Sequence, residues 1–361
     1  MQKRPRHFAS DNYAGICPEA WASLEQANQG HVPGYGDDPW TAKAADLLRE
    51  TFEMECEVFF VFNGTAANSL SLASTGQSYH SILCHETAHV ESDECGAPEF
   101  FSNGMKVLLL KGENGKIDPS GIEPVVKKRS DIHYPKPRAV SVTQATELGT
   151  VYSVPDLKDI WAKTKQLGLK LHMDGARFAN AVASLGCKPR EITWEAGVDV
   201  LCFGGTKNGT AVGDAVVFFN RDLAEEFDYR CKQSGQLASK MRYLSAPWVG
   251  MLKDGAWLRR AGHANAMARL LHDELVQIEE IEIMFPSQAN AVFARMPPWL
   301  VLALRQADWK FYTFIGQGGC RLMCAWDTTE DDVRQFIADI KRFLLEAPRD
   351  VEIGNVDHRK L

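Results

Sequence analysis

Lys207 and Asp174 are the two side chains whose settings most favour catalysis. Lys207 lies in Phe203-Gly-Gly-Thr-Lys-Asn-Gly209, directly after an apolar stretch that predicts a strand. Asp174 ends a second such stretch, Leu169-Lys-Leu-His-Met-Asp174. In open α/β sheets, ligands bind in the crevice at the carboxyl ends of strands. An exposed loop lysine and a helix N-cap aspartate remain the ordinary alternatives when each residue is taken alone.

The amine and the carboxylate together suit pyridoxal phosphate. Helical segments separate their two strands, and crossovers of this size place strands close together in one parallel sheet. A lysine amine can form an imine with the cofactor aldehyde, while a carboxylate keeps the pyridine nitrogen protonated. The ring can then accept electrons from Cα of a bound amino acid.

A third element, Asn63-Gly-Thr-Ala-Ala-Asn68, could supply the phosphate site. It joins the predicted strand Val58–Phe62 to a helix. Free backbone N–H groups at such a helix start can face a phosphate, and Thr65 adds a hydroxyl. A plain helix start is the alternative for this segment.

A competing motif is His85-Glu-Thr-Ala-His89, which matches the H-E-x-x-H pattern of zinc peptidases. Its setting is poor, because it directly follows the predicted strand His80–Cys84 and leaves about two helical turns before Gly96-Ala-Pro98. A third ligand could come from Glu91 or Glu94. A zinc hydrolase therefore stays as an alternative.

Composition describes an ordinary globular chain. The 361 residues are 45% hydrophobic and 24% charged, with a net charge of −7 that disfavours nucleic acid as a main partner. The longest apolar runs, such as Trp299–Leu304, are too short to span a membrane. The nine cysteines form no C-x-x-C pair, which suits free thiols in a reducing compartment. The first residues, Met1–Ser10, lack the apolar core of a signal peptide. Both observations predict a cytoplasmic protein.

Alternating strand and helix patterns predict an α/β fold with a mostly parallel, seven-stranded sheet. The predicted strands are Val58–Phe62, His80–Cys84, Lys106–Leu110, Arg138–Thr143, Leu169–Met173, Val198–Phe203 and Asp214–Phe219. The predicted helices between them are Thr65–Ser74, Pro119–Arg129, Pro155–Leu167, Gly175–Ser184 and Pro189–Ala196. The pattern changes later in the chain. We therefore expect a large domain over 1–255, N-terminal segment included, and a small α+β domain over 256–361.

The whole set of motifs resembles the pyridoxal-phosphate-dependent L-threonine aldolases, which are relatives of β-eliminating lyases and phenylserine aldolases. The resemblance runs from Phe8 to about Trp326. It rests on Phe8-Ala-Ser-Asp-Asn12, Tyr35-Gly-Asp-Asp-Pro39, Phe62-Asn-Gly-Thr-Ala-Ala-Asn68, Ala88-His89, Asp131-Ile-His133, His172-Met-Asp-Gly-Ala-Arg177 and the Lys207 segment. It implies fold type I of pyridoxal-phosphate enzymes, the fold of aspartate aminotransferase.

The resemblance also implies roles for single residues around the cofactor. Lys207 would bind it covalently, Asp174 would pair with its ring nitrogen, and His89 would stack on the ring. Its phosphate would be held by Gly64, Thr65 and Ala66. A cation from a neighbouring subunit has no clean match, with Lys240 and Arg242 as candidates.

Further roles concern the substrate and the subunits. The substrate carboxylate would bind Ser10, Arg177 and Arg321, because planar guanidinium groups suit carboxylates. His133, with His89, would lie near the β-hydroxyl group. Tyr35 would complete the site of a neighbour in a homo-oligomer, expected to be a dimer of dimers and thus a homotetramer.

Two departures from the family fall around the cofactor. Many members have Ser-Lys-Gly where this chain has Thr206-Lys207-Asn208, and a frequent Glu-Asn-Thr-His run is replaced by Thr143-Gln-Ala-Thr-Glu147. Both changes bear on substrate range.

We therefore expect an aldehyde-lyase that cleaves L-threonine, L-allo-threonine or phenylserine-type amino acids to glycine and an aldehyde. His89, His133 or an ordered water could remove the hydroxyl proton. A related lyase that eliminates at Cβ is the main alternative, and a zinc hydrolase is the other.

Overall fold

A seven-stranded sheet forms the centre of the computed structural model, which describes residues 6–314 and 318–346. The strand order is β1-β7-β6-β5-β4-β2-β3, and β7 is the one strand that runs antiparallel to its neighbours. The strands are β1 (Glu57–Val61), β2 (His80–His85), β3 (Lys106–Leu110), β4 (Lys136–Thr143), β5 (Lys170–Gly175), β6 (Val200–Phe203) and β7 (Asp214–Phe218). The predicted α/β fold with a mostly parallel sheet is confirmed.

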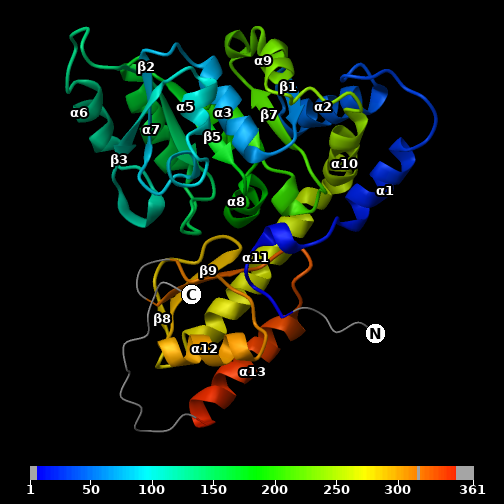
Figure 1. The fold of residues 1–361 in the computed structure, drawn as a ribbon, viewed down its shortest axis with the longest axis vertical. Helices are drawn as coiled ribbons and strands as arrows, with labels where there is room; N and C mark the ends of the chain where they lie inside the picture. The colour runs from blue at the N-terminus through cyan, green and yellow to red at the C-terminus, as the bar shows by residue number, and fades with distance from the viewer. Residues whose placement is uncertain (1–5, 315–317, 347–361) are drawn as a thin grey trace.

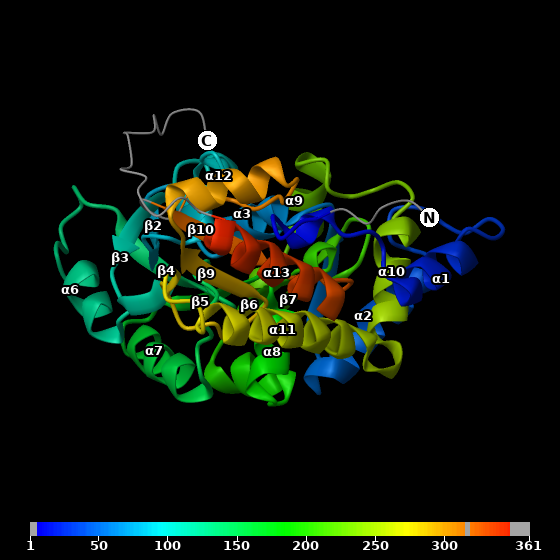
Figure 2. The same ribbon diagram turned by 90° about the horizontal axis from the view of Figure 1, so that it is seen from below.

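Helices cover both faces of this sheet, which explains why strands near its centre are buried on both faces. β6 and β7 are buried at every residue. Figure 2 shows α3 on one side of the strands and α7 and α8 on the other. The helices of this part are α1 (Pro18–Ala27), α2 (Pro39–Phe52), α3 (Gly64–Ser74), α4 (His89–Ser92), α5 (Ala97–Phe101), α6 (Ile122–Val126), α7 (Val154–Gln166), α8 (Phe178–Leu185), α9 (Phe227–Gln233) and α10 (Arg242–Leu252).

A second, three-stranded antiparallel sheet lies in the C-terminal part, in the order β10-β9-β8. Its strands are β8 (Glu282–Ile283), β9 (Ala291–Arg295) and β10 (Gly319–Met323), and its helices are α11 (Ala256–Leu275), α12 (Pro298–Gln306) and α13 (Glu330–Glu346). Figure 1 shows α11 running from the large body into the smaller one. The division at 255/256 remains a prediction, and residues 347–361 of the second domain lie outside the described range.

The N-terminal segment packs with the smaller body. Phe8 is fully buried in the C-terminal core, with its ring 5.7 Å from that of Trp309 and 5.1 Å from that of Phe336. Its N–H donates to Lys310 O at 2.7 Å. The next residues, from Ser10 onward, therefore start from the smaller body and reach the large sheet.

Three of the predicted helices differ from the structure. Residues 189–196 form two short 3-10 turns, Pro189–Ile192 and Trp194–Ala196, because Thr193 between them has non-helical backbone angles (φ −123°, ψ −109°). The helix expected from Gly175 begins at Phe178, because β5 continues through Gly175. The predicted helix at 119–129 is shorter, with α6 ending at Val126.

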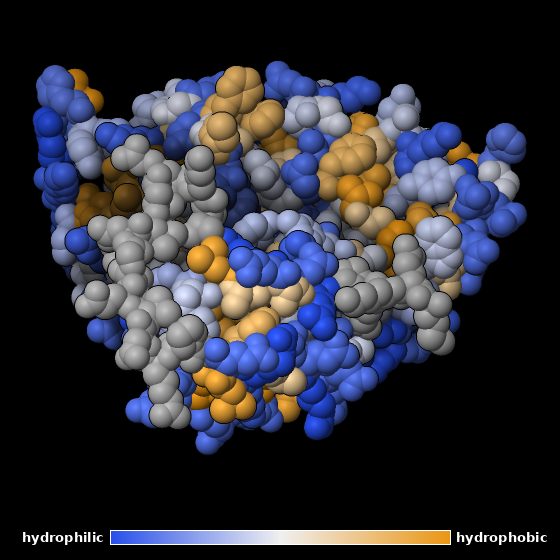
Figure 3. Space-filling view, turned by 60° about the horizontal axis from the view of Figure 1, so that its bottom comes forward, coloured by the Kyte–Doolittle hydropathy of each residue, from blue (hydrophilic) through white to orange (hydrophobic). Residues whose placement is uncertain are grey.

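No helix in the described part of the chain is long and apolar enough to cross a membrane. On the face that the space-filling view presents, hydrophobic side chains form separate groups among hydrophilic ones (Figure 3).

Candidate active site

A cavity of about 180 Å³ lies at the carboxyl edge of the large sheet. β5 and β6 are parallel neighbours, with Asp174 in register with Cys202, so both strands deliver their following residues to this edge. Lys207 and Asp174 both line the cavity, as do Gly64, Thr65 and His89. Five of the residues predicted from the sequence therefore meet at one place.

The turn that carries Lys207 is held by Asp214, a residue that the sequence analysis missed. Thr206–Asn208 form a 3-10 turn after β6. Asp214 Oδ1 accepts hydrogen bonds from the backbone N–H groups of Gly205 (2.8 Å) and Thr206 (3.3 Å). Burial raises the pKa of Asp214, although these N–H donors oppose the shift.

Asp174 is buried and aligned by two donors. Asn68 Nδ2 donates to its Oδ2 at 3.0 Å, and Ala176 N–H donates to its Oδ1 at 3.0 Å. Gln144 N–H also donates to the backbone oxygen of Asp174 at 2.8 Å, which ties the end of β4 to the end of β5. The carboxylate is thereby fixed at the cavity wall and is not an N-cap, because Arg177 occupies that position of α8.

The N-terminus of α3 forms another wall. Asn63 caps the helix, and its Oδ1 accepts from Ala66 N–H at 2.9 Å. The N–H of Ala66 is thus already bonded, and the cavity is lined by Gly64 and Thr65 instead. A Cβ at Gly64 would lie 3.3 Å from Asp214 Oδ2, so a larger residue would crowd this wall. The remaining N–H groups at a helix start are suited to a phosphate.

His89 begins α4 and lines the cavity from the side of β2. Its Nδ1 lies 2.9 Å from Oε1 of the buried Glu94. The hydrogen bond with Glu94 raises the pKa of His89, against the opposite effect of burial.

Arg177 is paired within the protein. Its Nε and NH2 groups donate to the two carboxylate oxygens of Asp11 at 2.8 and 3.0 Å, and both side chains are buried. Asn290 Nδ2 also donates to Asp11, at 3.1 Å. Burial alone would raise the pKa of Asp11, but the charge and hydrogen bonds of Arg177, together with Lys207 and Asn290, outweigh burial and hold that pKa below its usual range.

Arg321, from β10, lies near the same N-terminal segment. Its NH2 donates to Ala9 O at 3.2 Å, next to the buried Ser10. Its guanidinium lies 5.1 Å from the ring centroids of both Tyr312 and Phe314. Burial lowers the pKa of Arg321, and the charge of Arg177 lowers it further. The pKa of Arg177, in contrast, is raised, because the charge and hydrogen bonds of Asp11 outweigh its burial. Arg321 is therefore the guanidinium of this pair whose positive charge lacks a carboxylate partner among its hydrogen bonds within the described part of the chain, and an anion beside it would be favoured.

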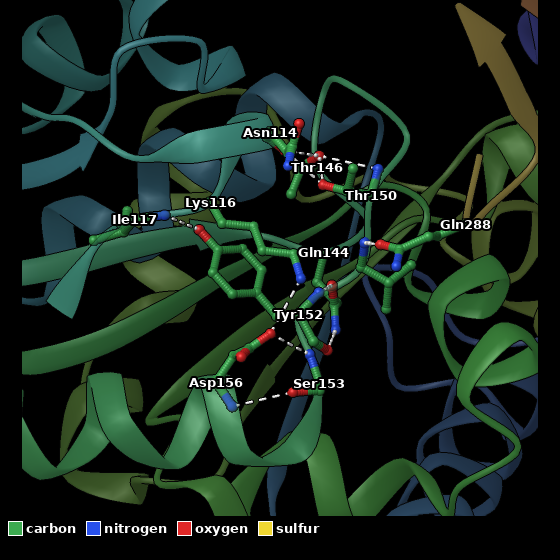
Figure 4. A network of polar contacts seen from close by, with 11 residues as sticks. Asn114, Lys116, Ile117, Gln144, Thr146, Thr150, Tyr152, Ser153, Asp156 and Gln288 are labelled. Carbon is green, nitrogen blue, oxygen red and sulfur yellow. Dashed lines mark hydrogen bonds and ion pairs between the residues drawn. The ribbon is translucent and has the colours of Figure 1, made fainter. Parts of the chain in front are cut away.

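The segment after β4, where this chain departs from the family run, is held by its own hydrogen bonds (Figure 4). Gln144 Nε2 donates to Tyr152 O at 2.8 Å, and Tyr152 N–H donates to Gln144 Oε1 at 3.0 Å. The hydroxyls of Thr146 and Thr150 lie 2.8 Å apart. Glu147, between these threonines, is half-buried and contributes to the raised pKa of His89.

The zinc alternative does not fit this geometry. His85 ends β2 and His89 begins α4, so the two residues do not share a helix face. The ring nitrogens of His85 contact Thr87 Oγ1 (2.8 Å) and Gly112 O (3.1 Å). Within residues 6–314 and 318–346, no group of three or more His, Cys, Asp or Glu side chains could hold a metal ion.

Seven predicted site residues do not line the cavity: Ala66, Ser10, Arg177 and Arg321, which are described above, and His133, Tyr35 and Lys240. His133 is exposed in the loop before β4, at the amino edge of the sheet, opposite the cavity. Tyr35 is 53% exposed, with Lys232 Nζ 4.7 Å from its ring centroid. Lys240 is also exposed, and Ser239 before it accepts a backbone hydrogen bond from Tyr35 at 3.2 Å. Arg242, the other candidate cation, donates to Gly30 O and to Tyr243 Oη.

Four polar residues of the site were missed from the sequence: Asp11, Asn68, Glu94 and Asp214. Asp11 and Asn68 stand inside motifs already singled out, so their polar character among small or apolar neighbours was a usable signal. Glu94 entered only as a possible zinc ligand. Asp214 begins an apolar strand, and no local pattern indicates its contact with the lysine turn.

Comparisons with known proteins agree with this site. The sequence model of the beta-eliminating lyase family matches residues 7–297. A low specificity L-threonine aldolase from a Pseudomonas species is 64% identical over 341 residues, covering 94% of this chain and 99% of that protein. The protein of the same name from Pseudomonas aeruginosa is 63% identical, with the same coverage.

Solved structures show the same likeness. A Leishmania major threonine aldolase superposes with a TM-score of 0.89 at 29% identity, covering 94% of this chain and all of that one. Oryza sativa TDC, solved with PLP, has a TM-score of 0.75 at 13% identity and covers 95% of this chain and 83% of that one, a likeness of fold.

Proposed function

Because the chain belongs to the family of β-eliminating lyases, we propose that it is a pyridoxal-phosphate-dependent aldolase of the low-specificity L-threonine type. It cleaves β-hydroxy-α-amino acids, such as L-threonine, L-allo-threonine or phenylserine, to glycine and an aldehyde. The observation that carries this proposal is the meeting of Lys207 and Asp174 in one cavity with the N-terminus of α3.

The donor set of the cavity fits pyridoxal phosphate. Lys207 would hold the aldehyde carbon, Asp174 the protonated ring nitrogen, and the helix start at Gly64 and Thr65 the phosphate. His89 would lie against the ring. When bound, the cofactor supplies an electron sink for the pair left on Cα as the Cα–Cβ bond breaks.

The substrate carboxylate is bound by the two arginines. Arg321 offers a guanidinium that is partnered by one backbone oxygen and two rings, while Arg177 is already held by Asp11. We assign the main contact to Arg321 and a supporting one to the NH1 group of Arg177, with Ser10 beside them. Fixing the carboxylate orients the Cα–Cβ bond relative to the cofactor ring.

His89 is the group of this chain best placed to take the hydroxyl proton. It lines the cavity, whereas His133 lies at the opposite edge of the sheet. The O–H bond breaks as an N–H bond forms, and the O–H electron pair becomes the second bond of the aldehyde carbonyl. His133 could contribute only from another subunit.

A homo-oligomer with shared sites is part of the proposal. Tyr35 and Lys240 lie near each other on an exposed surface, and neither reaches its own cavity. Their place supports a role in the site of a neighbouring subunit, within a dimer of dimers. Nine free cysteines, most of them buried, support a reducing, cytoplasmic location.

The test is a product assay on the purified protein loaded with pyridoxal phosphate. L-Threonine should give glycine and acetaldehyde, and the visible spectrum should change on addition of glycine. The family description also favours a second candidate, elimination at Cβ. A 2-oxo acid plus ammonia as the main products would establish that alternative instead.

A further inference from the structure

Glu94 is a buried carboxylate to which the proposed function gives no role. It is 3% exposed and lies two residues after the end of α4. Its Oε1 accepts from two groups, Asn68 Nδ2 at 2.8 Å and His89 Nδ1 at 2.9 Å. Its Oε2 has no hydrogen-bond partner among the described groups. A buried carboxylate with one oxygen unpartnered costs stability, so its presence beside the cavity requires an explanation.

The hydrogen bonds of Asn68 define which atom carries the proton in this contact. Its Nδ2 group has two hydrogens, and it donates to Glu94 Oε1 and to Asp174 Oδ2. Oε1 of Glu94 is therefore an acceptor, and the proton between Glu94 and His89 belongs to Nδ1. A neutral imidazole protonated at Nδ1 has a lone pair on Nε2.

We propose that Glu94 is the positioning residue of His89 and fixes its imidazole in the Nδ1–H form, so that Nε2 accepts the substrate's hydroxyl proton. The inference rests on the proposed function. A carboxylate behind an imidazole has this role in the triads of serine hydrolases. Here Asn68 adds a link, since one amide aligns both the carboxylate behind His89 and Asp174.

The charges around His89 support the assignment. The hydrogen bond with Glu94, from the segment after α4, is the largest cause that raises the pKa of His89. The charges of Asp174 from β5, Glu147 from the segment after β4 and Glu94 itself raise it further. Burial acts in the opposite direction. Removal of the Glu94 charge should therefore make His89 a weaker base.

The test compares Glu94→Gln and Glu94→Ala with the control Glu91→Gln in the holoenzyme. Gln keeps an oxygen acceptor but removes the charge, while Ala removes both. Glu91 is exposed on α4, the short helix that His89 begins, and Glu91→Gln removes one negative charge, as Glu94→Gln does. Four readouts are the kcat for L-threonine cleavage, the pH dependence of kcat/KM, the exchange of the glycine α-proton in D2O, and ¹⁵N NMR of labelled histidines. The His89 signal is assigned by its loss in His89→Gln.

The exchange reaction separates positioning from general damage, because glycine has no hydroxyl proton to remove. We expect cleavage to fall about 10-fold in Glu94→Gln and about 100-fold in Glu94→Ala, within the contribution of a positioned base. The rate of glycine α-proton exchange in both Glu94 variants should stay near the wild-type rate. Cleavage and exchange by the control Glu91→Gln should also stay near wild type. The acidic limb of the kcat/KM profile should move to lower pH in Glu94→Gln.

Wild-type ¹⁵N shifts should show neutral His89 protonated at Nδ1 and free at Nε2. The opposite tautomer overturns the proposal, even where the variants fail to fold. Equal losses of cleavage and exchange, or an unmoved acidic limb, overturn it as well. Absence of glycine release by the wild type refutes the proposed function instead, while the tautomer still decides the role of Glu94.

Discussion

Arg177 and Asp11 form a buried ion pair across 166 residues of sequence, with Nε–Oδ2 and NH2–Oδ1 distances of 2.8 and 3.0 Å. The pair joins the N-cap of α8 to the segment that enters from the smaller body. One edge of the guanidinium, formed by Nε–H and one N–H of NH2, is thereby fixed, which leaves NH1 and the second N–H of NH2 to reach a ligand. Because Asp11 belongs to the N-terminal segment, the position of that segment sets the position of the Arg177 guanidinium at the proposed site for the substrate carboxylate.

Arg177→Lys should raise the KM for L-threonine strongly, because an ammonium group cannot bond both oxygens of Asp11 and still reach the substrate. Steady-state kinetics measure this effect. Unchanged KM and kcat would exclude Arg177 from the site.

Asp11→Asn should also raise KM and should remove a pH dependence of stability. The pKa of Asp11 is lowered in the folded protein, so the pair stabilises the fold above the unfolded pKa of about 3.9 and is lost as the pH falls through the lower, folded value. Thermal unfolding measured from about pH 5 down to about pH 2 should therefore depend less on pH in Asp11→Asn. Parallel curves for both proteins would contradict this prediction.

Lys207 should be the residue that reacts with the cofactor. Borohydride reduction of the yellow holoenzyme should fix pyridoxal phosphate on Lys207, because only an imine is reduced to a stable amine in this way. Mass spectrometry of the labelled peptide identifies the site, and a label on another lysine would rule out the assignment. Lys207→Ala should lose nearly all turnover and still bind the cofactor non-covalently.

Asp174→Asn removes the charge that would keep the pyridine nitrogen protonated. We expect a loss of about 3 kcal/mol of transition-state stabilisation, on the order of 100-fold in kcat/KM. Asn68, which donates to Asp174, can rotate to bond the new amide oxygen, so the fold should persist. A wild-type kcat in this variant would refute the role of Asp174.

His85→Ala separates the cofactor chemistry from a zinc-based reaction. The substitution removes contacts with Thr87 and Gly112 and should cost about 1–3 kcal/mol of stability. Aldolase activity should remain largely intact, and chelators should not inhibit it. Activity that follows bound zinc and disappears with His85 would favour the hydrolase instead.

Subunit mixing tests the shared site. Lys207→Ala and Tyr35→Ala should each be inactive, and their heterodimer has one doubly altered and one intact site if Tyr35 acts across the interface. With random pairing, about a quarter of wild-type activity should return. No recovery after verified exchange would mean that Tyr35 acts within its own chain, and a fully active Tyr35→Ala would remove it from the site.

The sequence alone determined the sheet and the two residues at its carboxyl edge. Strands such as β5 and β6 are buried on both faces, so they appear as short, mainly apolar runs, and a polar residue at the end of a run or shortly after it marks the edge. Lys207 and Asp174 could be placed together because right-handed crossovers leave few arrangements for their strands. Helix bounds were less predictable where a strand continued, as at Gly175, or where one residue broke the helix, as at Thr193.

Only the tertiary structure decided which partners the site residues have. Asp11 and Arg177, or Glu94 and Asn68, are far apart in sequence, and no local pattern selects one buried pairing over another. His133 shows the same limit, since its motif suits catalysis but its loop precedes β4 and so lies at the amino edge. The physical reason is a difference in range. Strand burial follows from residues close together in sequence, so it can be predicted locally. The charges and hydrogen-bond partners of a buried group come from residues that the fold places beside it, and these can be far away in sequence.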